Sequence, residues 1–167
     1  MADQWVSFRE EHSELRAGLD RLRSVGDGVG RLNDVDLRNE LEDVYRFLSH
    51  RLLPHIAVEE EVLYPAIARL DGYRTAARIM SRDHAEVAEV VRELADMRLK
   101  LEGATFGAAE ATELRRLLYG LYQLLKTHMT KEEEICLTAL DQALSEDQVR
   151  ALDEEIRLFD AAEQAAE

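Results

Sequence analysis

Long stretches without helix-breaking residues constrain this chain most. Its 167 residues include only two prolines and eight glycines, so few positions interrupt a helix. Between these positions apolar residues recur every three or four places, which is the spacing of one face of an α-helix. The sequence therefore predicts an all-α fold.

Four long helices are expected, at about residues 4–24, 35–70, 75–101 and 108–144. Short or moderate connections between long helices favour an up-down-up-down four-helix bundle. Ser145 and Gln148 match a capping box, which predicts a short fifth helix followed by a frayed tail. We therefore expect a bundle over residues 1–145, with a C-terminal helix and tail, residues 146–167, packed on it.

Glycine and proline mark the expected irregularities of these helices. The segment "VGDGVGRLND", residues 25–34, has three glycines and should end the first helix. Pro54 and Pro65 should kink the second helix or fray its end, since neither has a backbone N–H to donate.

Charge and composition exclude several classes of partner. The formal net charge of −14 argues against nucleic acids and anionic membranes, which both require a basic surface. No apolar run reaches the roughly 20 residues of a membrane span, and residues 1–16 lack the pattern of a signal peptide. The single cysteine, Cys136, fits a reducing compartment, so a cytoplasmic location is expected.

An internal repeat carries the chemistry. Residues 55–67, "HIAVEEEVLYPAI", match residues 128–140, "HMTKEEEICLTAL", at five of thirteen positions, including the histidine and all three glutamates. Upstream, "EEHSEL" around His12 resembles "RDHAEV" around His84. The chain thus consists of two helix pairs, each with one histidine on its first helix and H-x-x-x-E on its second.

The spacing of H-x-x-x-E places histidine and glutamate one turn apart on the same face. The neighbouring residues on that face are apolar, so these polar groups should point into the bundle. Buried imidazoles and carboxylates are costly unless they are paired or bind a metal. The sequence therefore predicts a metal site made by six residues: His12, His55, Glu59, His84, His128 and Glu132. A metal-free network of His–Glu pairs is the alternative.

With this signature the sequence resembles the hemerythrin-like family, the bundles with an HHE cation-binding motif. The resemblance covers about residues 8–140. It implies a non-haem site of two Fe ions, bridged by two carboxylates and an oxo or hydroxo group, with the six residues above as ligands. Imidazole and carboxylate ligands with open positions also suit iron.

Two departures from the oxygen-carrying members matter. Those proteins have a second histidine one turn from the third-helix histidine, but the positions four away from His84 are Met80 and Ala88. Their last carboxylate follows its histidine by five residues, which here selects Glu133 rather than Glu132. The first departure disfavours simple reversible oxygen carriage, and the second leaves the choice between Glu132 and Glu133 open.

Other polar residues near the motifs have simpler interpretations. Glu60, Glu61 and Glu134 rotate away from the histidine's face and are expected to be solvated. Arg82 and Lys131 should be surface charges that pair with nearby glutamates. A ferritin-like di-iron site is disfavoured because its Glu-x-x-His motif is absent from all four histidines.

Three functions follow as hypotheses. The first is redox handling of oxygen, hydrogen peroxide or nitric oxide at a di-iron centre, with peroxide decomposition as one reaction and an unknown electron donor as a partner. The second is an iron or oxygen sensor or store without turnover, and the third is an interaction module with a relic site. A monomer or weak dimer is expected.

Overall fold

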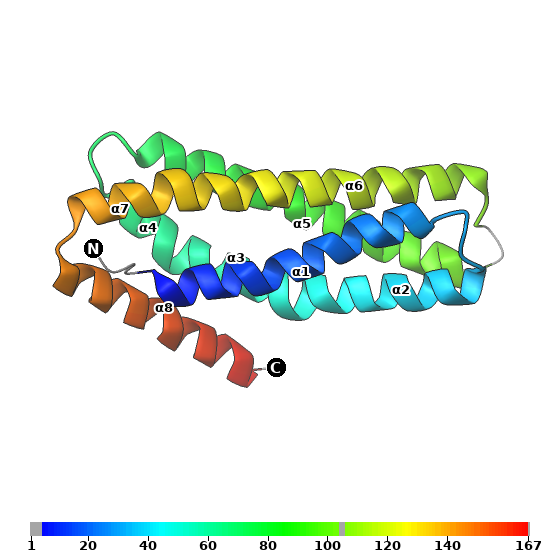
Figure 1. Ribbon diagram of the computed structural model, residues 1–167, viewed down its shortest axis with the longest axis horizontal. Helices are drawn as coiled ribbons and strands as arrows, with labels where there is room; N and C mark the ends of the chain where they lie inside the picture. The colour runs from blue at the N-terminus through cyan, green and yellow to red at the C-terminus, as the bar shows by residue number, and fades with distance from the viewer. Residues whose placement is uncertain (1–4, 104–105, 167) are drawn as a thin grey trace.

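The computed structural model describes residues 5–103 and 106–166, and all regular structure in these ranges is helical. Five helices follow one another along the chain (Figure 1): α1 (Val6–Gly28); a second helix built of α2 (Asp34–Phe47), η1 (Leu48–Leu52), α3 (Leu53–Val58), η2 (Glu59–Leu63) and α4 (Tyr64–Ala68); α5 (Arg74–Glu102); a fourth helix built of α6 (Ala108–Lys131), η3 (Glu132–Cys136) and α7 (Leu137–Ala143); and α8 (Glu146–Ala166). The predicted all-α bundle with a C-terminal fifth helix is confirmed. Among the described residues, no helix has both the length and the apolar composition needed to cross a membrane.

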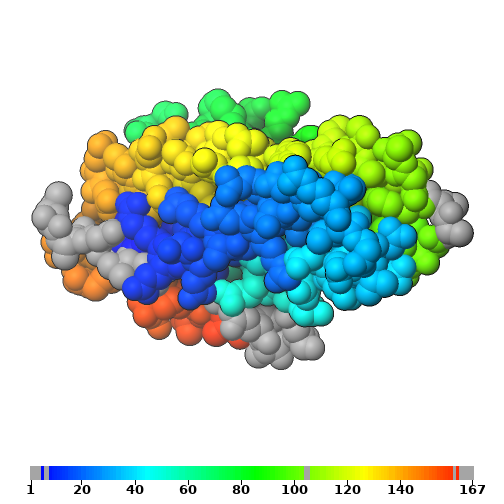
Figure 2. Space-filling model, turned by 45° about the vertical axis from the view of Figure 1, so that its right-hand side comes forward, coloured from blue at the N-terminus to red at the C-terminus, as the bar shows by residue number. Residues whose placement is uncertain are grey.

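The four long helices pack side by side, and α8 crosses them at one end (Figure 1). Helix α1 packs against α6 and α2, and α5 packs against α6, α2 and α4. Figure 2 shows α1 lying over the face between α2 and the fourth helix, so the residues on its inner side are covered. Helix α8 contacts α3 and η2, the part of the second helix that carries the first H-x-x-x-E motif.

Two helix ends differ from the sequence expectation. Helix α1 continues about one turn beyond residue 24, because Val25 and Val29 are buried against the bundle and stabilise the last turn. The glycines still end the helix, and Gly30 has the positive φ of 80° that favours glycine. The predicted start at Gln4 lies outside the described residues. The tail expected to fray is helical to Ala166, in keeping with its content of alanine, glutamate and glutamine.

Each proline follows a widened helical turn. The N–H of Leu53 bonds to the carbonyl of Leu48, and the N–H of Tyr64 bonds to that of Glu59, which are bonds across five residues. Such π-turns hold one residue more than an α-turn, so the kinks expected at Pro54 and Pro65 occur as insertions that leave the helix continuous. The fourth helix has the same turn at the repeat-equivalent place, η3, without a proline.

The core consists of two apolar clusters. The larger one fills the end of the bundle away from α8, with residues such as Leu22, Leu48 and Leu118 buried. The smaller one lies beneath α8 and includes Trp5 and Leu63. Along each long helix the histidine lies between residues of the two clusters, so the polar residues form a layer with apolar packing above and below.

Candidate metal centre

All six sequence-predicted site residues meet in this polar layer. None of their side chains is more than 4% exposed: His12 on α1, His55 on α3, Glu59 at the start of η2, His84 on α5, His128 on α6 and Glu132 at the start of η3. The two groups His12, His55, Glu59, Glu132 and Glu59, His84, His128, Glu132 each have nitrogen and oxygen atoms within 4.8 Å of one another. The layer thus holds two adjacent buried His/Glu clusters suited to a di-metal site.

Glu59 belongs to both clusters through its two oxygens. Its Oε1 lies 2.9 Å from His55 Nε2 and 3.7 Å from His12 Nε2. Its Oε2 lies 3.1 Å from His84 Nε2 on the other side. One carboxylate therefore faces a histidine pair with one oxygen and the second pair with the other.

Glu132 has the same relation to the two pairs. Its Oε2 lies 3.5 Å from His12 Nε2, and its Oε1 lies 3.5 Å from His128 Nε2. His84 Nε2 and His128 Nε2 are 2.9 Å apart. Because Glu133 lies outside this ring of Nε2 atoms, the geometry selects Glu132 as the residue between the histidine pairs.

Four outer carboxylates, Glu11, Glu60, Asp83 and Glu133, each accept a hydrogen bond from the Nδ1–H of one site histidine. The Nδ1–carboxylate distances are 3.2 Å for His55–Glu11, 2.7 Å for His84–Glu60, 3.2 Å for His128–Asp83 and 3.0 Å for His12–Glu133. An ionised carboxylate only accepts, so each bond holds a proton on Nδ1 and directs Nε2, the nitrogen available to a metal, to the centre.

These outer carboxylates occupy equivalent positions in the two copies of the internal repeat. Glu11 and Asp83 directly precede the histidines of the first and third helices, and Glu60 and Glu133 directly follow the central glutamates. Glu60 was expected to be solvated, and that expectation is wrong. A side chain at the flank of a helix faces the neighbouring helix, and Glu60 reaches the back of His84 on α5 in this way. Glu60 and Glu133 occupy equivalent positions of the internal repeat, and this equivalence could have indicated that Glu60 contacts a site histidine.

Opposing effects set the charges in the layer. Burial disfavours the charged form of His55, but Glu59 and Glu11 outweigh it and raise the histidine's pKa well above its ordinary value. Burial likewise acts to raise the pKa of Glu59, but His55 and the neighbouring histidines hold it well below the usual range. Burial opposes the charge of Asp83 too, and bonds from Lys131 and His128 lower its pKa. Glu59 and Asp83 are therefore ionised at neutral pH.

The residues present fit a pair of metal ions. Within the polar layer, four buried atoms have no hydrogen-bond partner among the described residues: His12 Nε2, Glu59 Oε1 and Oε2, and Glu132 Oε2. All four face the centre of the layer, where an unsatisfied buried polar atom costs about 1–3 kcal/mol. A cation at each cluster would satisfy them.

Tyr64 is a site residue that the sequence reading missed. Its hydroxyl donates to Glu132 Oε1 and lies 3.3 Å from His84 Nε2 and 3.2 Å from His128 Nε2. Burial and the charges of Glu59 and Glu132 raise its pKa far above the ordinary value, so the phenol stays protonated. The widened turn η2 directly precedes Tyr64 and carries it inward. The spacing of apolar residues in the sequence does not predict this widened turn.

Cys136 lies in the core beneath α8, where it is 1% exposed. Burial and the charges of Glu132 and Glu59 raise its pKa to about 12, so it is not a thiolate at neutral pH. Of the two positions four residues from His84, Met80 is buried and Ala88 faces solvent.

The comparisons with known proteins agree with this geometry. A protein-family model, the hemerythrin HHE cation binding domain, matches residues 5–140. No curated protein and no solved structure matches the chain. Since the family model spans most of the chain and includes all six central residues, this protein belongs to the hemerythrin HHE cation-binding family.

Proposed function

We propose that the protein binds two iron ions in the polar layer and reacts there with a small oxygen species: oxygen, hydrogen peroxide or nitric oxide. The observation that carries the proposal is the arrangement of Glu59 and Glu132, each with one oxygen toward each histidine pair. In this arrangement both carboxylates would bridge the two ions. The oxo or hydroxo bridge that the family implies would complete the centre.

Iron suits the donor set of the layer. Each ion would have two imidazole nitrogens and two carboxylate oxygens, a mixture that iron accepts with further positions left open. When bound, iron supplies a redox couple and a Lewis acid that polarises a ligand at an open position. The outer carboxylates keep the four Nε2 lone pairs directed inward for this purpose.

Tyr64 favours a reaction over simple carriage. Its hydroxyl lies beside His84, on the half of the site where oxygen-carrying relatives have an additional histidine. The phenol is protonated and donates to Glu132. With Glu132 engaged as a metal ligand, the Tyr64 O–H would be available to donate to a small oxygen species in the layer, which supports peroxide decomposition as the proposed reaction.

Metal analysis combined with a peroxide assay tests the proposal. The iron-loaded protein should contain about two ions per chain and consume hydrogen peroxide, and the chelated protein should not. A His128→Asn variant should lose iron and turnover. His50→Asn is the matched control because His50 lies on the exposed surface of η1. Iron content well below one per chain, or an iron-loaded form that reacts with neither peroxide, oxygen nor nitric oxide, contradicts the proposal.

An iron or oxygen sensor or store is the second candidate. It is favoured by the four unpartnered buried atoms, because metal that satisfies them adds its binding energy to folding. A large rise in melting temperature on iron loading, without peroxide turnover, would favour this function over the first.

A further inference from the structure

Four arginines at one end of the bundle have no partner in the described part of the chain. Arg69, Arg74, Arg78 and Arg82 are exposed, and none makes a hydrogen bond or ion pair with another described residue. Arg82 was expected to pair with a nearby glutamate, and this expectation is wrong. On a chain with a net charge of −14, four neighbouring unpaired cations form a local reversal of charge.

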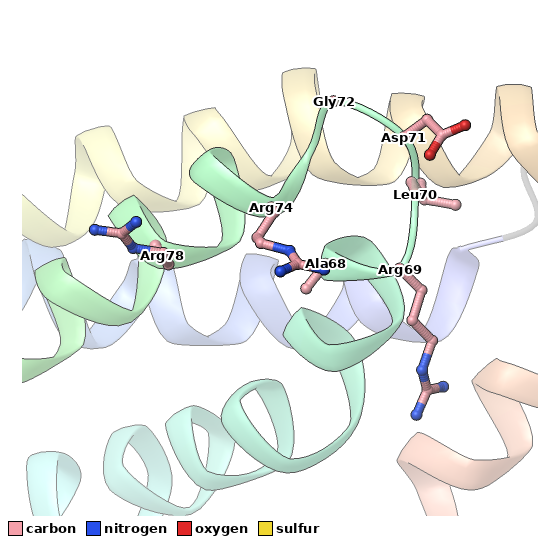
Figure 3. A pocket seen from close by; sticks show the side chains of 7 residues that line it. All are labelled: Ala68, Arg69, Leu70, Asp71, Gly72, Arg74 and Arg78. Carbon is pink, nitrogen blue, oxygen red and sulfur yellow. The ribbon is translucent and has the colours of Figure 1, made fainter.

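The four arginines are spread over an extended surface, here called the arginine face. Arg74, Arg78 and Arg82 lie on successive turns of α5, about 6 Å apart along its axis. Arg69, Arg74 and Arg78 line a shallow cavity of about 570 Å³ at the α4–α5 connection, where Asp71 is the single carboxylate. Figure 3 shows the Arg69 and Arg78 side chains pointing away from one another rather than converging on one point.

Apolar surface lies beside the arginines. Ile79 on α5 is 50% exposed and Ile135 on η3 is 47% exposed. Asp83 and Lys131 form an ion pair between the two helices. Ile79 lies four residues before Asp83, and Ile135 lies four residues after Lys131. Because the two helices are antiparallel, both isoleucines lie toward the same end of the bundle. The arginine face therefore borders a small apolar area.

The arginine face is also next to the metal centre. Asp83, adjacent to Arg82 in sequence, accepts a hydrogen bond from His128 Nδ1 at 3.2 Å, and its side chain is 19% exposed. Asp83 is thus in contact both with solvent at this surface and with His128 of the metal centre.

We propose that the arginine face docks an acidic one-electron donor protein that reduces the di-iron centre. This proposal rests on the proposed redox function. Opposite charge favours encounter and orientation, and a small apolar area with a charged rim suits the limited interfaces of electron-transfer complexes. Because the chain has a net charge of −14, the unpaired arginines give such a donor a local site of attraction.

A row of spaced, diverging guanidinium groups fits a row of carboxylates on a protein better than one compact anion. A phosphate site would require arginines that converge for bidentate bonds, and Figure 3 shows no such convergence. In each encounter the donor would give up one electron, and one ferric ion held by the central histidines and glutamates would become ferrous, without transfer of a proton or a group. Two encounters reduce both ions.

Binding is tested first, on both the metal-free and the iron-loaded protein. The probe is a plant-type [2Fe–2S] ferredoxin, an acidic one-electron carrier, and cytochrome c serves as the basic counterpart. Ferredoxin should bind the wild type at low salt and weaken steeply as salt rises. Arg78→Glu should weaken binding about tenfold. Arg92→Glu on the same helix should not, since it lies about 20 Å from Arg78 along the axis.

Electron transfer is tested second, by mixing reduced ferredoxin with the ferric protein. Arg78→Glu should slow this reduction about tenfold and leave reduction by dithionite unchanged. Equal binding by wild type and Arg78→Glu, preference for cytochrome c, or binding of pyrophosphate in place of ferredoxin each overturns the proposal. If ferredoxin binds and reduces iron through this face while peroxide, oxygen and nitric oxide all fail to react, the docking face stands and the proposed function fails.

Discussion

Replacing Glu60 by glutamine tests whether the outer carboxylates hold the metal centre. Glu60 Oε1 accepts from His84 Nδ1 at 2.7 Å, and its Oε2 accepts from Ser81 Oγ at 2.8 Å. Glutamine has the same size and can keep an oxygen at either place, so Glu60→Gln removes mainly the negative charge. The ring of His84 then has a weaker acceptor behind it and is a poorer ligand.

The size of the effect follows from the type of hydrogen bond. A bond to a charged group contributes about 1.5–3 kcal/mol and a neutral one about 0.5–1.5 kcal/mol. Because the Glu60 side chain is 34% exposed, the low end applies, and a loss of about 1.4 kcal/mol corresponds to about tenfold weaker metal binding. The expected change is therefore about a factor of ten in affinity at one of the two metal positions.

Competition with a chelator of known affinity measures this change, with Co²⁺ as a coloured probe of the imidazole-bound site. Glu61→Gln is the matched control, since Glu61 is adjacent, exposed and without a partner among the described residues. The repeat offers a second trial, in which Glu133→Gln should weaken binding and Glu134→Gln should not. If Glu60→Gln and Glu61→Gln bind Co²⁺ with equal affinity, the outer carboxylates do not support the ligands.

Three further predictions concern stability and protons. Tyr64→Phe should lower the free energy of unfolding of the metal-free protein by about 1–2 kcal/mol in urea, because the buried Glu132 loses a donor. Leu114→Ala, at a position with 0% exposure in the far cluster, should cost about 2–5 kcal/mol in the same assay and leave the metal content unchanged. Metal uptake should release protons, because the raised pKa of His55 means that its ring holds a proton that the metal must displace. Apparent affinity should therefore increase with pH until the pH exceeds the raised pKa of His55, which calorimetry in buffers of different ionisation heat can measure; a pH-independent affinity contradicts this account.

The sequence by itself determined the helical class, the bundle and the six central residues. Periodicity is a local property, and H-x-x-x-E fixes two side chains on one face of a single helix. The duplication of this pattern then indicated that the polar residues of both copies form one site. No contact between helices was needed for these conclusions.

Only the tertiary structure decided what surrounds those residues. Glu60, Tyr64 and Asp83 act across helix boundaries, where the rotation and level of two helices decide which side chains meet. The widened turns change that rotation, and one of them occurs without a proline, so spacing alone could not locate them. The central position of Glu132 rather than Glu133, and the lack of a partner for Arg82 among the described residues, have the same origin. Both depend on the position of a neighbouring helix relative to the residue.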